Sequence, residues 1–255
     1  MTHLDKKNLL LLNLILGFFA WSDISKLQVP EGFEIQEFVT EIDDARQMVE
    51  GNNYIFVGTK SAGNVYAIDK NNSNKVSTIL TELDMPTGVA LKNGDLYIAE
   101  TDTIHVVKNI ESKLVTNEQI TTEIFFSDLP RKTMWNPVKK AWHGWKWIDF
   151  GPDGALYISE GVPCNVCDEN DPRYGTILKL DNNILSIYAD GVRNSVGFDW
   201  HPETKEMYFT DNGRDWMGDD IPPCELNRVV NAGDHFGFPF FHGKNIPDTG
   251  FEAPE

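Results

Sequence analysis

Four short segments built around a tyrosine recur along this chain, and they constrain its fold more than any other feature. The segments are Asn53-Tyr54-Ile55-Phe56, Leu96-Tyr97-Ile98-Ala99, Leu156-Tyr157-Ile158-Ser159 and Met207-Tyr208-Phe209-Thr210. Their tyrosines are 43, 60 and 51 residues apart. Short runs of aromatic and β-branched residues are typical of strands. We therefore expect a repeating β-structured unit.

Further strands are expected on both sides of these segments. Before three of them, an apolar run leads into a turn: Gly88-Val89-Ala90-Leu91, Trp147-Ile148-Asp149-Phe150 and Gly197-Phe198-Asp199-Trp200. After each of them another strand follows, at residues 64–69, 103–107, 175–180 and 225–229. Turns with Asn-Gly or Asp-Gly suit hairpins because their glycines accept a positive φ. No segment shows a sustained helical period, so the sequence predicts an all-β protein.

Units of this size with about four antiparallel strands are characteristic of β-propeller blades. A single such sheet cannot bury both of its faces, so neighbouring blades must stack. Four units are visible, and nothing after Val230 completes a fifth. The tail at 236–243 is rich in aromatic residues, Gly and Pro, as in a connection between blades, which suggests an N-terminal portion of a larger ring. A complete four-bladed propeller and a β-sandwich remain alternatives.

The N-terminus predicts export. Lys6 and Lys7 precede an uncharged apolar run at 9–20, which is shorter than the roughly 20 residues that span a bilayer and matches a signal peptide. We expect residues 1–22 to be a signal peptide and residues 23–255 to be the propeller portion, in a periplasmic or secreted protein without a stable membrane span. An uncleaved anchor and a buried N-terminal helix are the alternatives.

The charge balance argues against some partners. The chain has 39 acidic against 22 basic residues and a formal net charge of −17. Nucleic acid or an anionic membrane would have to approach against a repulsive field. We therefore expect no nucleic-acid partner.

Two equivalent loops carry candidate catalytic residues. His143 and Arg193 each lie a few residues before the first strand of a unit, so adjacent blades should bring them together. Histidine suits a general base, and arginine can hold a carboxylate or a developing oxyanion with two donors. Taken singly, a structural histidine and a surface cation are the simpler interpretations.

A third loop, residues 210–227, holds five carboxylates in 18 residues together with Gly and Asn. Such a loop could supply the oxygen ligands that Ca²⁺ needs, although a solvated acidic loop is the alternative. Cys164 and Cys167 form a Cys-x-x-Cys pair without a second pair for zinc and without a βαβ context for a redox motif. We expect a structural disulfide there, with Cys224 left over.

With these loops, the sequence resembles the glucose/sorbosone dehydrogenase family, soluble pyrroloquinoline quinone (PQQ) enzymes with a six-bladed propeller, and most closely its L-sorbosone dehydrogenase-like branch. The resemblance runs from about Val29 to the end of the chain. It rests on His143-Gly144 with Phe150-Gly151-Pro152-Asp153-Gly154, 163–167, 193–202, 211–227 and Phe236-Gly237-Phe238-Pro239.

The resemblance implies a hydride transfer from a sugar or sugar-derived aldehyde to PQQ, with a soluble electron acceptor. It implies that His143 removes the substrate hydroxyl proton and that Arg193 lies against the quinone oxygens. Asn194 and Asn212 would lie beside the cofactor. A bound Ca²⁺ would take the backbone carbonyls of Gly213 and Arg214.

The sequence departs from the family pattern at two points. The expected calcium-binding carboxylate just before Glu225-Leu226-Asn227 is Cys224, and a thiolate is a poor ligand for a hard cation. Either Asp219 or Asp220 reaches the ion instead, or Cys224 bonds with another cysteine and the metal site is weakened; both alternatives stay open. The later blades, which supply further basic residues to PQQ in the family, are missing from this chain.

Two other function classes remain open. A Ca²⁺-dependent propeller lactonase would need side-chain carboxylates and an asparagine from several blades. A non-catalytic propeller would use its channel mouth to bind a sugar or a protein.

Overall fold

The computed structural model describes residues 24–131 and 142–253. The chain divides into two compact units, Met1–Thr40 and Glu41–Glu255. In the described part of the first unit, the regular element is the 3₁₀ helix η1 (Ile24–Lys26). The expected signal peptide at 1–22 lies outside the described residues. None of the helices in the described part is long and apolar enough to cross a membrane.

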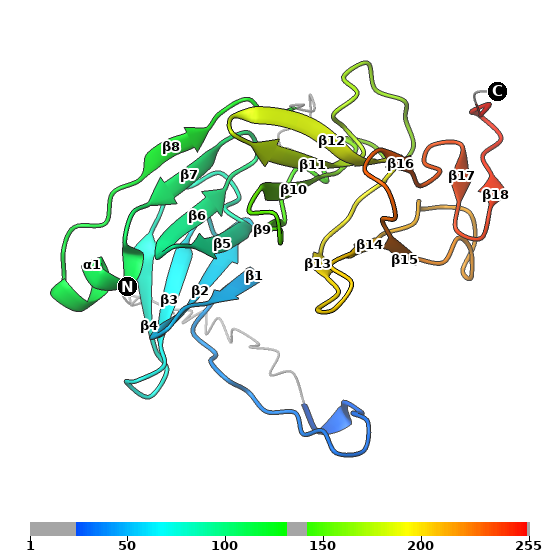
Figure 1. Ribbon diagram of the computed structural model, residues 1–255. Coiled ribbons are helices and arrows are strands. Elements are labelled where there is room, and N and C mark those ends of the chain that lie inside the picture. Colours follow the sequence, from blue (N-terminus) through cyan, green and yellow to red (C-terminus); the bar gives the residue numbers. More distant parts are fainter. Residues whose placement is uncertain (1–23, 132–141, 254–255) are drawn as a thin grey trace, which may run out of the picture. The chain divides into compact units, whose positions relative to one another are not determined.

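The second unit begins with two four-stranded antiparallel sheets (Figure 1). The strands of the first sheet, called blade 1, are β1 (Ala45–Glu50), β2 (Tyr54–Thr59), β3 (Val65–Asp69) and β4 (Lys75–Leu80). Those of blade 2 are β5 (Gly88–Lys92), β6 (Asp95–Ala99), β7 (Ile104–Val107) and β8 (Glu123–Phe126). A short helix, α1 (Ile110–Thr116), connects β7 to β8.

Two further blades follow. Blade 3 contains β9 (Ile148–Phe150), β10 (Leu156–Glu160), β11 (Thr176–Asp181) and β12 (Ile184–Asp190), with β16 (Asp234–His235) added parallel to β12. Blade 4 contains β13 (Phe198–Trp200), β14 (Met207–Asp211) and β15 (Glu225–Arg228). The last two strands, β17 (Phe241–His242) and β18 (Ile246–Pro247), form a hairpin.

The sequence repeat is confirmed as the blade repeat. Each of the four tyrosine segments lies within or overlaps the second strand of a blade, and the expected strands flank it. The structure has the four-blade propeller arrangement, and the β-sandwich is wrong because each sheet packs against the next one in sequence. The sequence analysis did not predict α1, whose short helix lies between two strands of blade 2.

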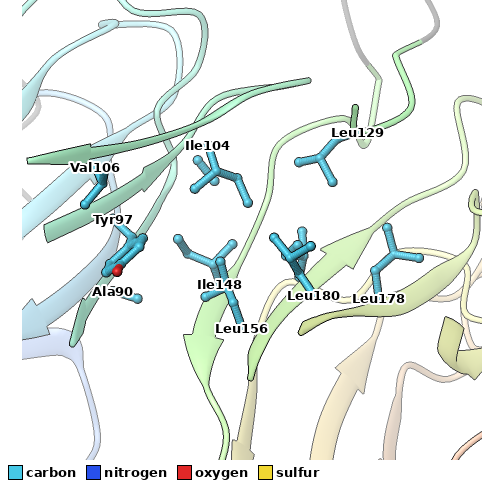
Figure 2. Packing of buried hydrophobic residues seen from close by; sticks show 11 residues of the cluster. Ala90, Tyr97, Ile104, Val106, Leu129, Ile148, Leu156, Leu178 and Leu180 are labelled. Atoms are coloured by element: carbon cyan, nitrogen blue, oxygen red, sulfur yellow. The ribbon is translucent and has the colours of Figure 1, made fainter. Parts of the chain in front are cut away.

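The core lies between consecutive blades. Along β6, Leu96 and Ile98 pack into the cluster shared with blade 1, whereas Tyr97 and Ala99 pack into the cluster shared with blade 3. Successive side chains of a strand point to opposite faces, so a central blade is apolar on both. Figure 2 shows the second cluster, in which Tyr97 faces residues of blade 3.

A buried glutamine ties together the first strands of three blades. The Gln47 side-chain oxygen on β1 accepts hydrogen bonds from the backbone N–H of Val89 at 3.2 Å and of Ile148 at 3.1 Å. Its amide nitrogen donates to the Ile148 carbonyl at 2.6 Å. Because these partners belong to β5 and β9, the innermost strands are fixed to one another by polar contacts as well as by apolar packing.

Candidate functional site

His143 and Arg193 occupy equivalent places in consecutive blades. His143 lies five residues before Ile148, where β9 begins, and Arg193 lies five residues before Phe198, where β13 begins. Both are buried, with 5% and 4% of their surface exposed. The structure therefore brings together the two residues that the repeat predicted to be neighbours.

One backbone residue connects them. The carbonyl of Val162 accepts a hydrogen bond from His143 Nδ1 at 2.8 Å, and the N–H of Val162 donates to the carbonyl of Arg193 at 3.0 Å. A carbonyl can only accept, so the proton of neutral His143 is on Nδ1. Nε2 is left with a free lone pair and has no hydrogen-bond partner among the described residues.

The surroundings of His143 keep its imidazole neutral. Burial, followed by the positive charge of Arg193, lowers the pKa of His143 to about 4. The rings of Trp142 and Trp145 lie 5.1 Å and 5.9 Å from the imidazole, between ring centroids. At neutral pH the side chain is therefore an unprotonated base held between aromatic rings.

The close approach of a glycine lets His143 occupy this position. A Cβ atom built on Gly161 would lie 2.7 Å from His143 Cβ and 3.1 Å from Asn194 Oδ1. No side chain fits at that separation. Gly161 directly follows β10, so the end of this strand forms the floor beneath both His143 and Asn194.

Each of the three guanidinium nitrogens of Arg193 donates a hydrogen bond. Nε donates to the carbonyl of Asn165 at 2.9 Å, Nη2 to the Asn165 side-chain oxygen at 3.0 Å, and Nη1 to the carbonyl of Asn212 at 3.0 Å. A guanidinium has five N–H groups, so these bonds leave two of them without a partner in the described part of the chain. The side chain of Asp215 is 4.0 Å from Nη2.

A buried carboxylate that the sequence analysis counted only as a possible metal ligand supports this loop. Asp211 accepts hydrogen bonds from the backbone N–H groups of Arg193 at 2.9 Å and Asn194 at 2.7 Å. Burial raises the pKa of Asp211 to about 7, and the two amides oppose that rise. Its oxygens bind the backbone of the Arg193 loop, which fixes the start of blade 4.

A buried ion pair anchors the loop that carries His143. Lys146 Nζ lies 2.6 Å from Glu160 Oε2, and both side chains are fully buried. The Thr87 hydroxyl accepts from the N–H of Lys146 at 3.0 Å and donates to its carbonyl at 2.9 Å. Neither partner was singled out from the sequence, because their contact joins residues without a recognisable motif.

A cavity of about 380 Å³ lies beside this cluster. Its walls come from the start of β1 and from the loops that precede β5, β9 and β13, so all four blades contribute. The lining residues are Ala45, Arg46, Gln47, Thr87, Trp145, Lys146, Trp147 and Val196. Trp145 connects the cavity to His143, because its ring contacts the imidazole.

The predicted calcium ligands lie in the loop between β14 and β15. Asp219 and Asp220 are exposed, and Arg214 forms an ion pair with Asp248. Residues 24–131 and 142–253 contain no group of three or more His, Cys, Asp or Glu side chains arranged to hold a metal. The Ca²⁺ site at Gly213 and Arg214 stays a prediction.

The cysteines behave as expected. Cys164 and Cys167 form a disulfide, and Cys224 is free and exposed. The disulfide closes a small ring that contains Asn165, the main acceptor for Arg193. The disulfide therefore lies next to the candidate site, a position that the cysteine spacing alone did not reveal.

Comparison with known proteins gives one sequence relative. No family model matches the chain. The chain is 33% identical over 246 residues to an uncharacterised protein of Borreliella burgdorferi (strain B31), and the match covers 91% of this chain and 62% of that protein. The chain thus spans less than two thirds of its relative.

Several solved structures share the fold. The PQQ-bound aldose sugar dehydrogenase from Streptomyces coelicolor has a TM-score of 0.61 at 17% identity, over 86% of this chain and 69% of that one. A Trichoderma reesei protein of carbohydrate-active enzyme family AA12 has a TM-score of 0.67 at 16% identity, over 84% and 60%. A proposed glucose dehydrogenase from Thermus thermophilus has a TM-score of 0.62 at 19% identity, over 86% and 71%. These likenesses define the chain as a β-propeller protein.

Proposed function

We propose that this chain is part of a PQQ-dependent oxidoreductase that oxidises a sugar or a sugar-derived aldehyde. The observation that carries the proposal is the convergence of His143 and Arg193 on Val162. The fold supports it, because proteins described as sugar dehydrogenases, one of them PQQ-bound, share this blade arrangement. The resemblance in sequence to the glucose/sorbosone dehydrogenases points to the same chemistry.

His143 has the state that a general base requires. Its Nδ1 proton is held by the Val162 carbonyl, so Nε2 is the atom that accepts the hydroxyl proton of the substrate. Because burial and Arg193 keep the imidazole neutral at physiological pH, the base is ready without a preceding deprotonation. Trp142 and Trp145 limit the access of water to it.

Arg193 fits the quinone end of the cofactor. Asn165 and Asn212 fix the plane of its guanidinium, and two N–H groups remain to donate to quinone oxygens. Bound PQQ would supply a two-electron acceptor for the hydride that leaves the substrate carbon. Asn194 follows Arg193 in the sequence, and Asn212 contacts both residues, because its carbonyl accepts from Arg193 and its N–H donates to the Asn194 carbonyl at 3.1 Å.

The calcium donors fit less well. Cys224 replaces the expected carboxylate, and Asp219 and Asp220 are exposed. Calcium is retained as a proposed companion of PQQ, and no step of the reaction is assigned to it. The aldose or sorbosone type of substrate, a soluble electron acceptor and export to the periplasm or beyond complete the proposal.

The test is reconstitution of this chain and of the longer Borreliella relative with PQQ, with and without Ca²⁺. Sugar-dependent reduction of an artificial electron acceptor is expected, together with its loss in H143Q. Absence of such reduction in both proteins would overturn the proposal. Turnover of a lactone with metal and no quinone would instead identify a hydrolase, and sugar binding that survives H143A without any turnover would identify a binding module.

A further inference from the structure

We propose that Lys60 and Arg46, beside Trp145, form a subsite for a carboxylate of the substrate, so that the sugar is a sugar acid such as a uronic acid. This inference rests on the proposed function, because it assigns the substrate class of the same site. It starts from Arg46, which lines the cavity of about 380 Å³, and from Lys60, which lies over the ring of Trp145, another lining residue.

Lys60 follows β2 and lies over the ring of Trp145. Its Nζ is 3.6 Å from the ring centroid, and no carboxylate of the described residues lies within ion-pair distance of it. Burial, and next the nearby charge of Arg46, lower the pKa of Lys60, while Asp44 opposes them. The ammonium is therefore a cation whose environment would be improved by an incoming anion.

Arg46 supplies the second positive charge. It lines the cavity, and 46% of its side chain is exposed. The N–H of Lys60 donates to the carbonyl of Asp44 at 3.3 Å, which places Lys60, directly after β2, next to the start of β1, where Arg46 lies. Asp44 is 3.3 Å from Arg46 and also accepts from the N–H of Ser61. One carboxylate thus faces two cations, and the subsite keeps a net positive charge within a strongly acidic chain.

The subsite lies next to the candidate base. Trp145 contacts Lys60 on one side and His143, at 5.9 Å between ring centroids, on another. The charge of Lys60 is itself among the causes that lower the pKa of His143. One monosaccharide could therefore place a hydroxyl at His143 and a carboxylate at Lys60 and Arg46.

The cavity suits such a ligand. Its volume falls within the roughly 300–1,000 Å³ of small-molecule sites. Trp145 and Trp147 provide apolar ring surface of the kind that packs against the C–H faces of a sugar, whereas the cations would select the carboxylate. Since Arg46 and Lys60 come from blade 1, they are separate from the Arg193 loop.

The experiment compares a sugar acid with its neutral partner. Binding of glucuronate and of glucose to the chain without cofactor is measured by isothermal titration calorimetry, for the wild type, K60M and R46M. We expect glucuronate to bind more tightly than glucose, and K60M to weaken glucuronate binding about tenfold while leaving glucose unchanged. The matched control is K92M, because Lys92 also lies over an aromatic ring, 4.6 Å from the centroid of Phe150, but that ring does not line the cavity.

Three outcomes would overturn the inference. Glucuronate could bind no more tightly than glucose, or not at all. K60M could weaken the binding of both sugars equally, which would mean that Lys60 only positions the Trp145 ring and does not bind the carboxylate. K60M could also weaken the binding of PQQ, itself a carboxylic acid, and spare glucuronate, which would assign the cations to the cofactor.

The oxidation assay separates this inference from the proposed function. Oxidation of glucose without any preference for glucuronate would refute the carboxylate subsite but would support the proposed dehydrogenase function. Tight, Lys60-dependent binding of glucuronate with no oxidation of any sugar would refute the proposed dehydrogenase function but would support the carboxylate subsite.

Discussion

His143 and Arg193 both hydrogen-bond to the backbone of Val162. The Val162 carbonyl accepts from the His143 imidazole at 2.8 Å, and the Val162 N–H donates to the backbone carbonyl of Arg193 at 3.0 Å. The two side chains come from loops that precede different blades. Their spacing is therefore set by how blade 3 packs on blade 4, through the cluster that contains Tyr157, Phe198 and Phe209.

His143→Gln tests the general base. Glutamine can still donate to the Val162 carbonyl, but it offers no nitrogen lone pair to accept a proton. We expect sugar oxidation by the PQQ-loaded protein to fall by about 10²- to 10⁴-fold, the usual contribution of a general base. PQQ binding, followed by its absorbance, should change little. A variant that keeps more than a tenth of the wild-type rate would show that another group takes the proton.

The same residue makes stability depend on pH. The folded-state pKa of His143 is about 4 and its ordinary value is 6.5, so between these values the unfolded chain binds more protons. The stability is fully present above pH 6.5 and is lost as the pH falls toward 4, by up to about 3 kcal/mol. Urea unfolding between pH 4 and 7 should show wild type losing stability relative to H143Q. Parallel curves for the two proteins would contradict the lowered pKa.

Asn165 tests how Arg193 is positioned. N165A removes one acceptor of the guanidinium and loosens the loop that carries the other, so a buried donor loses its partner. We expect a loss of about 1–3 kcal/mol in urea unfolding and a larger proportional loss of PQQ affinity. The control is N231A, whose exposed side chain donates to Asp234 at 3.5 Å. Equal effects of the two substitutions would mean that Asn165 does not hold Arg193.

The small disulfide ring should act on the site more than on the fold. Replacing Cys164 and Cys167 by serine frees the segment around Asn165, yet a ring this short adds little loop-closure entropy. We expect a loss in stability of no more than about 2 kcal/mol, but weaker PQQ binding. Unchanged cofactor affinity in the double variant would assign the staple a purely structural role.

The blades were predictable because the sequence pattern that defines each strand lies within a few consecutive residues. β6 buries alternate residues in two different clusters, which gives an apolar run around Tyr97 that can be recognised wherever it recurs. β1 was missed, because its buried residue is Gln47, which binds backbone groups instead of packing as an apolar side chain. The irregular spacing of the tyrosine segments left a β-sandwich as an alternative. One contribution to it is α1, which lengthens the interval between Tyr97 and Tyr157.

The site was only partly predictable. Repeat equivalence found His143 and Arg193, since corresponding loops of stacked blades must meet. Asp211 at the end of β14, and Asn165 and Lys60 in other loops, also reach the site, and no spacing in the sequence predicts that these segments meet. Within the acidic loop, the sequence did not distinguish Asp211, which accepts from two backbone amides, from the exposed Asp219 and Asp220.

The buried pair of Lys146 and Glu160 yields the last prediction. Burial raises the pKa of Glu160 to about 7, and the ammonium of Lys146 opposes that rise. E160Q leaves the lysine charge buried without its partner, and we expect a loss of about 3–5 kcal/mol in urea unfolding. The double variant K146M/E160L replaces the pair by apolar side chains and should recover most of that loss. If the double variant is as unstable as E160Q, the cost comes from packing rather than from an uncompensated charge.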